Sequence, residues 1–251
     1  MKVIQQISGA SLPGMIRCGV IALCLSAPYS TAGEETMPCA VSSDTNLPFF
    51  GDLHIHTRYS FDSYLSNQKN DPDGAYEYAK GQVITLPDAY GEQALSAQID
   101  RPIDFAAVTD HGQFLGEVAL CDSDWTEPGW WAPVCIMSRT QNLWVQLYAA
   151  SLWTVSGGME GKAPERGMVC SLGDCEANAL STWEDIQAAA ERHYDRSDDC
   201  SFTTFVGYEY TQGQEMANLH RNVIFKGEQV TRLPISVFDT DSSVPELWRQ
   251  L

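Results

Sequence analysis

Positive charge is scarce in this sequence. There are 15 lysine and arginine residues against 33 aspartate and glutamate residues, so the formal net charge is -18 at pH 7. The phosphates of DNA or RNA would be repelled by so acidic a surface, and we therefore expect no nucleic-acid partner. A small phosphorylated substrate stays compatible with the composition, because bound metal ions can reverse the local field. Apart from such a site, the charge indicates a solvated surface.

A long hydrophobic run is also missing. The apolar stretch at residues 18–27 spans about 10 residues, whereas a helix that crosses a membrane needs about 20. Lys2 and Arg17 are the only charged residues among the first 32, and residues 30–32 supply the small side chains of a cleavage site. This pattern is typical of a secretory signal peptide, with an uncleaved anchor or a buried helix as the alternative. We expect a secreted or periplasmic protein, cleaved near Ala32, whose mature chain has no integral membrane segment.

The short Cys-x-x-Cys spacing that is typical of zinc clusters is absent as well. Of the eight cysteines, Cys18 and Cys24 fall in the signal segment, so six remain in an exported protein. An even number of cysteines in an oxidising compartment predicts up to three disulfides, which we favour over a zinc site. Local closure favours the pairs Cys121–Cys135 and Cys170–Cys175, which leaves Cys39–Cys200.

The composition predicts a folded protein with a buried core, because 44% of the residues are hydrophobic and 19% are charged. A length of 251 residues allows one large domain or two small ones. Residues 33–48 are polar and irregular, and we interpret them as a linker. Beyond them, the periodicity of apolar residues predicts alternating strands and helices. The predicted strands cover 49–56, 102–109, 203–208 and 220–225, and the predicted helices cover 71–80, 92–99, 141–154, 181–194 and a segment from 243.

Strands that alternate with helices predict the α/β class, as a layered sheet or a barrel. Local signals set several helix ends: Asp71 and Pro72 form a helix start, and residues 181–184 form a capping box. Residues 118–173 are rich in tryptophan and cysteine and are interpreted as an insertion in the core. Its tryptophans are expected either to line a substrate site or to form a local core around the disulfides.

His54 and His56 lie two residues apart on the first predicted strand, so their side chains leave the same face. Two adjacent imidazoles can chelate a metal ion, and Asp52 on that face could orient one of them. Asp62, a few residues further along, is another candidate ligand. Histidines at this spacing are also common without a ligand role, so the motif needs support from elsewhere in the chain.

Three more clusters follow or close the buried apolar strands. Charged residues rarely stand there without partners, which makes Thr109-Asp110-His111 a candidate site, with a helix cap as the alternative. Glu209 closes the next strand, where a carboxylate could bridge two cations. His220 and Arg221 belong to the last cluster, and the arginine could bind a phosphate or form a surface ion pair.

Four of the five histidines fall in these clusters, which is the strongest internal indication of a metal site. The fifth, His193, comes near the end of a predicted helix and is interpreted as a surface residue or a partner of the helix dipole. Nitrogen ligands combined with carboxylates suit zinc, manganese or iron. A G-x-S-x-G nucleophile elbow is absent, so nothing favours a serine hydrolase.

Residues 50–62 and 107–111 resemble the PHP superfamily, named for polymerase and histidinol phosphatase. The first two PHP motifs, H-x-H-x-x-x-S and T-D-H, occur here in order and about 55 residues apart. Residues 207–210 and 218–225 resemble a large, mostly bacterial, uncharacterised branch of PHP-like proteins. The resemblance covers about residues 49–251, with the insertion included.

This resemblance implies a distorted PHP-type (β/α)7 barrel that hydrolyses phosphoesters. It also implies two or three divalent metal ions. His54 and His56 would bind one ion, and Asp62 and His111 a second. Glu209 would bridge ions, and His220 would help to bind a third.

Catalytic roles are assigned to Arg58, Asp110 and Arg221. The family also has later His and Asp ligands, and nothing after His220 can fill those places. We therefore expect residues 49–251 to be an incomplete, N-terminal portion of the barrel.

The leading hypothesis is an exported metal-dependent hydrolase, most consistent with a phosphoesterase that uses a metal-activated water on a small phosphorylated molecule. A metal-dependent amidohydrolase-like enzyme is a second hypothesis, because histidine ligands in a barrel support both reactions. A third hypothesis is a secreted module that binds a metal or a ligand without catalysis.

Overall fold

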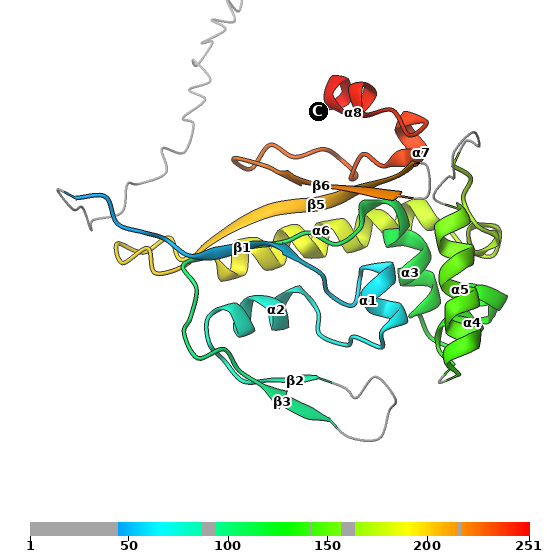
Figure 1. The fold of residues 1–251 in the computed structure, drawn as a ribbon, viewed down its shortest axis with the longest axis horizontal. Helices are drawn as coiled ribbons and strands as arrows, with labels where there is room; N and C mark the ends of the chain where they lie inside the picture. Colours follow the sequence, from blue (N-terminus) through cyan, green and yellow to red (C-terminus); the bar gives the residue numbers. More distant parts are fainter. Residues whose placement is uncertain (1–44, 87–93, 141, 157–163, 215–216) are drawn as a thin grey trace, which may run out of the picture. The chain divides into compact units, whose positions relative to one another are not determined.

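A mixed four-stranded β-sheet forms the framework of the fold (Figure 1). The structure is a computed structural model that describes residues 45–86, 94–140, 142–156, 164–214 and 217–251. All of these residues lie in the unit Pro38–Leu251. The predicted signal peptide with its cleavage site at Ala32, most of the predicted linker and Cys39 lie outside the described residues.

The described residues form the strands β1 (Gly51–Ile55), β2 (Ile84–Leu86), β3 (Leu95–Ala97), β4 (Phe105–Val108), β5 (Thr203–Gln214) and β6 (Ala217–Ile224). The main sheet has the order β1-β4-β5-β6, in which β1, β4 and β5 are parallel and β6 is antiparallel to β5. Strand β4 is central and almost entirely buried, as its run of small and branched apolar side chains predicts. Strands β2 and β3 form a separate antiparallel pair.

The helices are α1 (Phe61–Leu65), α2 (Pro72–Ala79), α3 (Leu115–Cys121), α4 (Pro133–Ser138), α5 (Leu143–Ser156), α6 (Cys175–His193), α7 (Val237–Thr240) and α8 (Val244–Gln250). Helix α6 runs along the sheet and contacts β4, β5, α2 and α3 (Figure 1). Helix α2 begins as predicted, with the carboxylate of Asp71 accepting the backbone N–H of Gly74 and Pro72 in the first turn. The protein is therefore of the mixed α/β class, as expected.

The sheet is strongly curled. Strands β1 and β6 are its two edges, and in a flat sheet they would lie about 14 Å apart, three strand spacings of ~4.8 Å. The side-chain amide of Asn222 on β6 nevertheless donates to the backbone oxygen of Leu53 on β1 at 2.7 Å. The two edges therefore approach each other across one face of the sheet, and side chains on that face converge.

Strand β5 separates two environments because its side chains alternate between the faces of the sheet. Tyr208 and Tyr210 are fully buried in the main hydrophobic core with Trp183 of α6. Glu209 and Thr211 point to the opposite face, where the curl brings β1 and β6 together. Glu209 and Thr211 are thus set on a strand whose other face is anchored in the core.

A second hydrophobic cluster gathers α3, α4 and α5 around two disulfides. The predicted pairs Cys121–Cys135 and Cys170–Cys175 are both confirmed. The third predicted pair involves Cys39, outside the described residues. Trp153 is buried in this cluster, as a local core around the disulfides predicts, whereas Trp125, Trp131 and Trp144 are exposed.

One predicted helix is wrong, and a second predicted helix exists but begins earlier than expected. The described part of segment 92–99 contains strand β3, because a short apolar run does not distinguish a single helical turn from a short strand. The capping box predicted at 181–184 lies inside α6, which begins at Cys175 with the carboxylate of Asp174 accepting the N–H of Ala177. Helix α7 was not predicted, although Ser236 and Asp239 form a capping box at its start.

Among the described residues, no helix has the length and apolar character needed to cross a membrane.

Gly116 allows α3 to pack closely against the start of α6. A Cβ atom at this position would lie 2.0 Å from the backbone oxygen of Cys175, so the two helices would have to separate. We expect Gly116→Ala to destabilise the protein by about 1–3 kcal/mol, the usual effect of overpacking. For a chain of this size the melting temperature falls by about 2–4 °C for each kcal/mol. Gly227→Ala is the matched control, because nothing lies within 4 Å of its added Cβ. Equal melting temperatures for the two variants would contradict this account of the packing.

Candidate metal centre

The carboxylate of Glu209 is the point on which the site residues converge. Its side chain is fully buried, and a buried carboxylate is strongly disfavoured unless positive charge or hydrogen bonds compensate it. Four imidazoles surround it, and each has a ring nitrogen within 3.6 Å of one of the two carboxylate oxygens. They belong to His54, His56, His111 and His220. Four of the five histidines in the chain therefore surround one buried acid.

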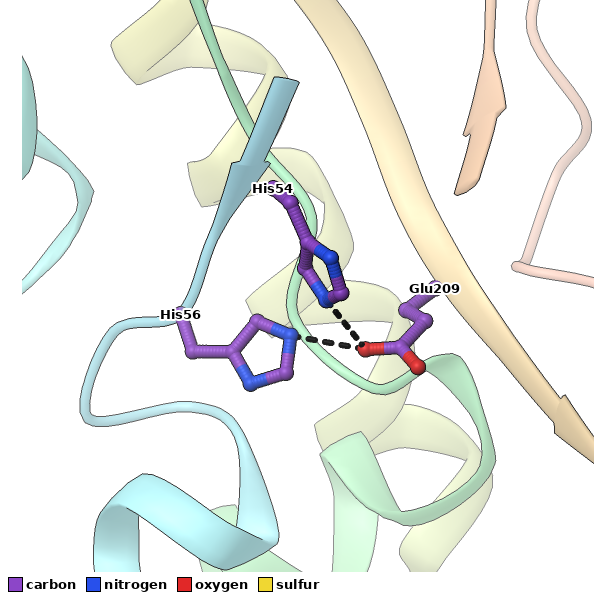
Figure 2. A group of neighbouring side chains, drawn as sticks. All are labelled: His54, His56 and Glu209. Carbon is purple, nitrogen blue, oxygen red and sulfur yellow. Dashed lines mark hydrogen bonds and ion pairs between the residues drawn. The ribbon is translucent and has the colours of Figure 1, made fainter. Parts of the chain in front are cut away.

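His54 and His56 come from β1 and the residue just beyond its end. Their Nε2 atoms lie 3.0 Å and 2.7 Å from the same oxygen, Oε2 of Glu209, as Figure 2 shows. The side chain of His54 is 51% exposed, so solvent reaches the site from this side. Asp52 does not orient either ring in the predicted way, because its carboxylate accepts the backbone N–H of His54 at 2.9 Å.

His111 and His220 are joined to Glu209 through Thr211. The Nδ1 atom of each imidazole lies 3.0 Å from the hydroxyl oxygen of Thr211, and this hydroxyl donates to Oε1 of Glu209 at 2.8 Å. Nδ1 of His220 also contacts Oε1 directly. The sequence interpretation missed Thr211, yet its place two residues after Glu209 on one strand puts both side chains on the same face.

Two of the site residues do not stand where the sequence suggested. Glu209 was expected to close its strand and His220 to begin one, but β5 and β6 form a long hairpin that pairs Glu209 with Asn222 and Thr211 with His220. The apolar sequence pattern stops before the strands do, because the residues of the hairpin that face the candidate site are polar. Strand length was therefore underestimated where the candidate site begins.

Asp62 supplies a second carboxylate from the first turn of α1. Its Oδ2 atom lies 3.0 Å from Nδ1 of His56 and 3.5 Å from Nε2 of His111. The ring of His56 consequently stands between two acids, with Asp62 on its Nδ1 side and Glu209 on its Nε2 side.

The six predicted ligands form overlapping groups that could each hold a metal ion. Within each group the potential ligand atoms lie within 4.8 Å of one another. The buried Nε2 atom of His56 has no hydrogen-bond partner, although it is 2.7 Å from Oε2 of Glu209. The two atoms are thus close without the alignment of a hydrogen bond, as expected for two ligands of one cation. The groups are His54/His56/Glu209, His56/Asp62/His111 and His111/Glu209/His220.

The electrostatics of the centre favour a cation. Burial alone would lower the pKa of His56, but the carboxylates of Asp62 and Glu209 raise this pKa to about 10. Burial would raise the pKa of Glu209, but the contact with His56 and its neighbours lowers it to about 2. The contacts with His111 and His56 likewise hold the pKa of Asp62 well below its usual range, against the effect of burial. The acids therefore stabilise positive charge here, whether a proton on His56 or a bound ion.

Asp110 holds the loop that carries the ligands. It is fully buried, and its two oxygens accept the backbone N–H of Thr57 at 2.5 Å and the Thr57 hydroxyl at 2.7 Å. Burial raises the pKa of Asp110 to about 6, against the opposing effect of these hydrogen bonds. Ser60 in the same loop accepts the backbone N–H of His111 at 3.2 Å. These contacts give Asp110 a positioning role, and the catalytic role assigned to it stays a prediction.

The two arginines assigned catalytic roles form contacts with groups other than the candidate ligands. The guanidinium of Arg58 forms a salt bridge with Asp122. Arg221 follows His220 on β6 and pairs in register with Tyr210, so it points to the core-facing side of the hairpin. His193 ends α6 as expected, but it is not a surface residue: its side chain is 11% exposed and contacts Asp73 at 2.9 Å.

The positioning role of Asp110 can be tested by substitution. Asp110→Ala leaves the N–H of Thr57 without this acceptor, which should lower the free energy of unfolding by about 1–3 kcal/mol and weaken metal binding. Asp110→Asn should do less, because the amide oxygen still accepts from Thr57 and the Thr57 hydroxyl can rotate to accept in turn. Chemical unfolding and metal titration measure both effects. If Asp110→Ala instead left both the free energy of unfolding and the metal affinity unchanged, the positioning role of Asp110 would be refuted.

The chain was also compared with known proteins. Neither the curated proteins nor the solved structures contain a match to it. A family model described as "Protein of unknown function (DUF3604)" matches residues 43–251, a range that includes every residue of the candidate metal centre. Because this match spans well over half of the sequence, the chain belongs to the DUF3604 family.

Proposed function

We propose that this protein is a metal-dependent hydrolase that uses two or three divalent ions of zinc, manganese or iron. The observation that carries the proposal is the convergence of four imidazoles and two carboxylates in overlapping ligand groups. Nitrogen and carboxylate ligands together suit these metals. Bound ions of this kind lower the pKa of a water molecule and stabilise the charge that develops on the attacking and leaving oxygens.

The ligands divide into a buried base and an open rim, which suits a reaction with a substrate from solution. Glu209 and His111 are almost completely buried, so their positions are held by the surrounding packing. The side chains of His54 and His220 are 51% and 42% exposed, which leaves the rim accessible. Glu209 belongs to two of the ligand groups and is suited to join two ions.

A cleft beside the centre supports the binding of a small molecule. It has a volume of about 590 Å³, and His54 and His56 form part of its wall. Asn70, Tyr78 and Ile84 line it as well. Pockets of this size, mostly apolar with a few polar groups, are typical of small-molecule sites.

Within this class we favour phosphoester hydrolysis in a PHP-type barrel. The support is the resemblance of residues 50–62 and 107–111 to the first two PHP motifs, and the curl of the sheet is compatible with a barrel. Because Arg58 is paired with Asp122 and Arg221 is in register with Tyr210, the negative charge of a phosphoryl group would be met mainly by bound ions. The two disulfides support an oxidising compartment, such as the periplasm or the exterior of the cell.

The test is metal analysis of the purified protein, followed by assays on a panel of phosphomonoesters and phosphodiesters. We expect at least two equivalents of zinc, manganese or iron, loss of hydrolysis with a chelator, and recovery when the metal is restored. Glu209→Gln removes the charge that the four histidines share, and it should weaken metal binding by more than ~10-fold, the loss seen even for residues that only support ligands.

Glu184→Gln is the matched control, because Glu184 is exposed on α6 and should leave metal content and turnover unchanged. A protein without stoichiometric metal would refute the whole proposal. A protein that holds metal but hydrolyses neither class of ester would refute phosphoester hydrolysis, and turnover of amide substrates would then favour the amidohydrolase alternative.

A further inference from the structure

A second cleft lies in the disulfide-bonded helical region, apart from the metal centre. It has a volume of about 270 Å³ and is bounded by α3, α4, α5 and the 3-10 turn Met168–Ser171. None of the six candidate ligands is among the residues that line it. Its walls are almost entirely apolar, and the rings of Phe114 and Trp153 meet edge to face there, with centroids 5.1 Å apart.

Glu117 is the only charged residue among the described residues that line this cleft. Its side chain is 1% exposed. Oε1 accepts a hydrogen bond from Nη1 of Arg166 at 2.8 Å, whereas the buried Oε2 has no hydrogen-bond partner. Burial raises the pKa of Glu117, against the opposing effect of Arg166. A buried carboxylate oxygen without a partner is unfavourable, and a hydrogen-bond donor brought to it would relieve this cost.

A metal ion is not the partner that this carboxylate lacks. Glu117 lies near the sulfur atoms of Cys170 and Cys175, a grouping that can hold a metal when the cysteines are free. These two cysteines form a disulfide, so neither supplies the thiolate that a metal requires. Arg166 already balances the charge of Glu117, so the missing partner can be a neutral donor.

We propose that this cleft binds a small apolar molecule that carries one N–H or O–H group, and that the Glu117 side chain, which lines the cleft, turns to accept a hydrogen bond from this group through Oε2. The apolar body of the ligand packs on Phe114 and Trp153. The volume of about 270 Å³ exceeds the ~150 Å³ of an engineered cavity that accommodates benzene, so a molecule of one or two rings fits. The cleft is partly open to solvent, so a small molecule can enter it.

Indole and benzofuran are suitable probes, because they share a size and shape and differ in whether an N–H or an oxygen occupies the ring. Binding is followed by NMR of ¹³C-methyl-labelled methionine, since Met137 and Met168 both line the cleft. Their signals are assigned with Met137→Leu and Met168→Leu. We expect saturable shifts of both signals with indole at one equivalent, and at least ~10-fold weaker binding of benzofuran, a difference of about 1.4 kcal/mol.

Two variants test the geometry. Glu117→Gln can replace Oε2 with an amide donor, so it should remove the preference for indole over benzofuran. Leu152→Trp fills the cleft and should abolish binding of both probes, whereas Leu147→Trp, at an exposed position on the same helix, should leave binding intact. Equal affinity for the two probes in the wild type, absence of any methionine shift, or unchanged binding in Leu152→Trp would each overturn the proposal. If Glu117→Gln does not fold, the proposal is still tested by the two probes in the wild type and by Leu152→Trp. None of these measurements depends on bound metal.

Discussion

The burial of one carboxylate governs the arrangement of the candidate centre. Glu209 is completely inaccessible to solvent, and an ionised acid in such a place requires compensating partners. The chain provides them from both edges of the sheet, with His54 on β1 and His220 on β6, and this is possible only because the sheet is curled. Alternation along β5 then sets the two environments, with Glu209 facing the histidines and Tyr208 and Tyr210 anchored in the core.

Hydrogen bonds connect the loops that follow β1 and β4. Asp110 accepts two hydrogen bonds from Thr57, and Ser60 accepts one from the backbone of His111, so the segments after β1 and β4 constrain each other. Asp62 at the start of α1 is thereby placed against His56 and His111. Such preorganisation lets the site hold several negative and positive groups within hydrogen-bonding distance without a change of fold.

Much of the candidate site could be predicted from local sequence, because H-x-H and Thr-Asp-His each mark chemistry within a few residues of a strand. The six candidate ligands were all named in advance, and the structure brings them together. What local patterns miss is pairing at long range. The length of β5 depends on its pairing with β6. Helix α6 begins earlier than predicted because the carboxylate of Asp174 caps it. The segment around Leu95 is a strand because it pairs with β2. Arg58 and Arg221 were assigned from charge alone, and their contacts with Asp122 and along β6 depend on the tertiary fold.

The central claim is that the imidazoles around Glu209 bind metal together with carboxylates. X-ray absorption spectroscopy of the zinc-loaded protein tests it most directly, because the method reports the atoms around the ion. The account predicts a shell of nitrogen and oxygen at about 2.0–2.1 Å, with the outer scattering of more than one imidazole and no sulfur. A sulfur shell at about 2.3 Å, or an environment of water oxygens without imidazole, would contradict it.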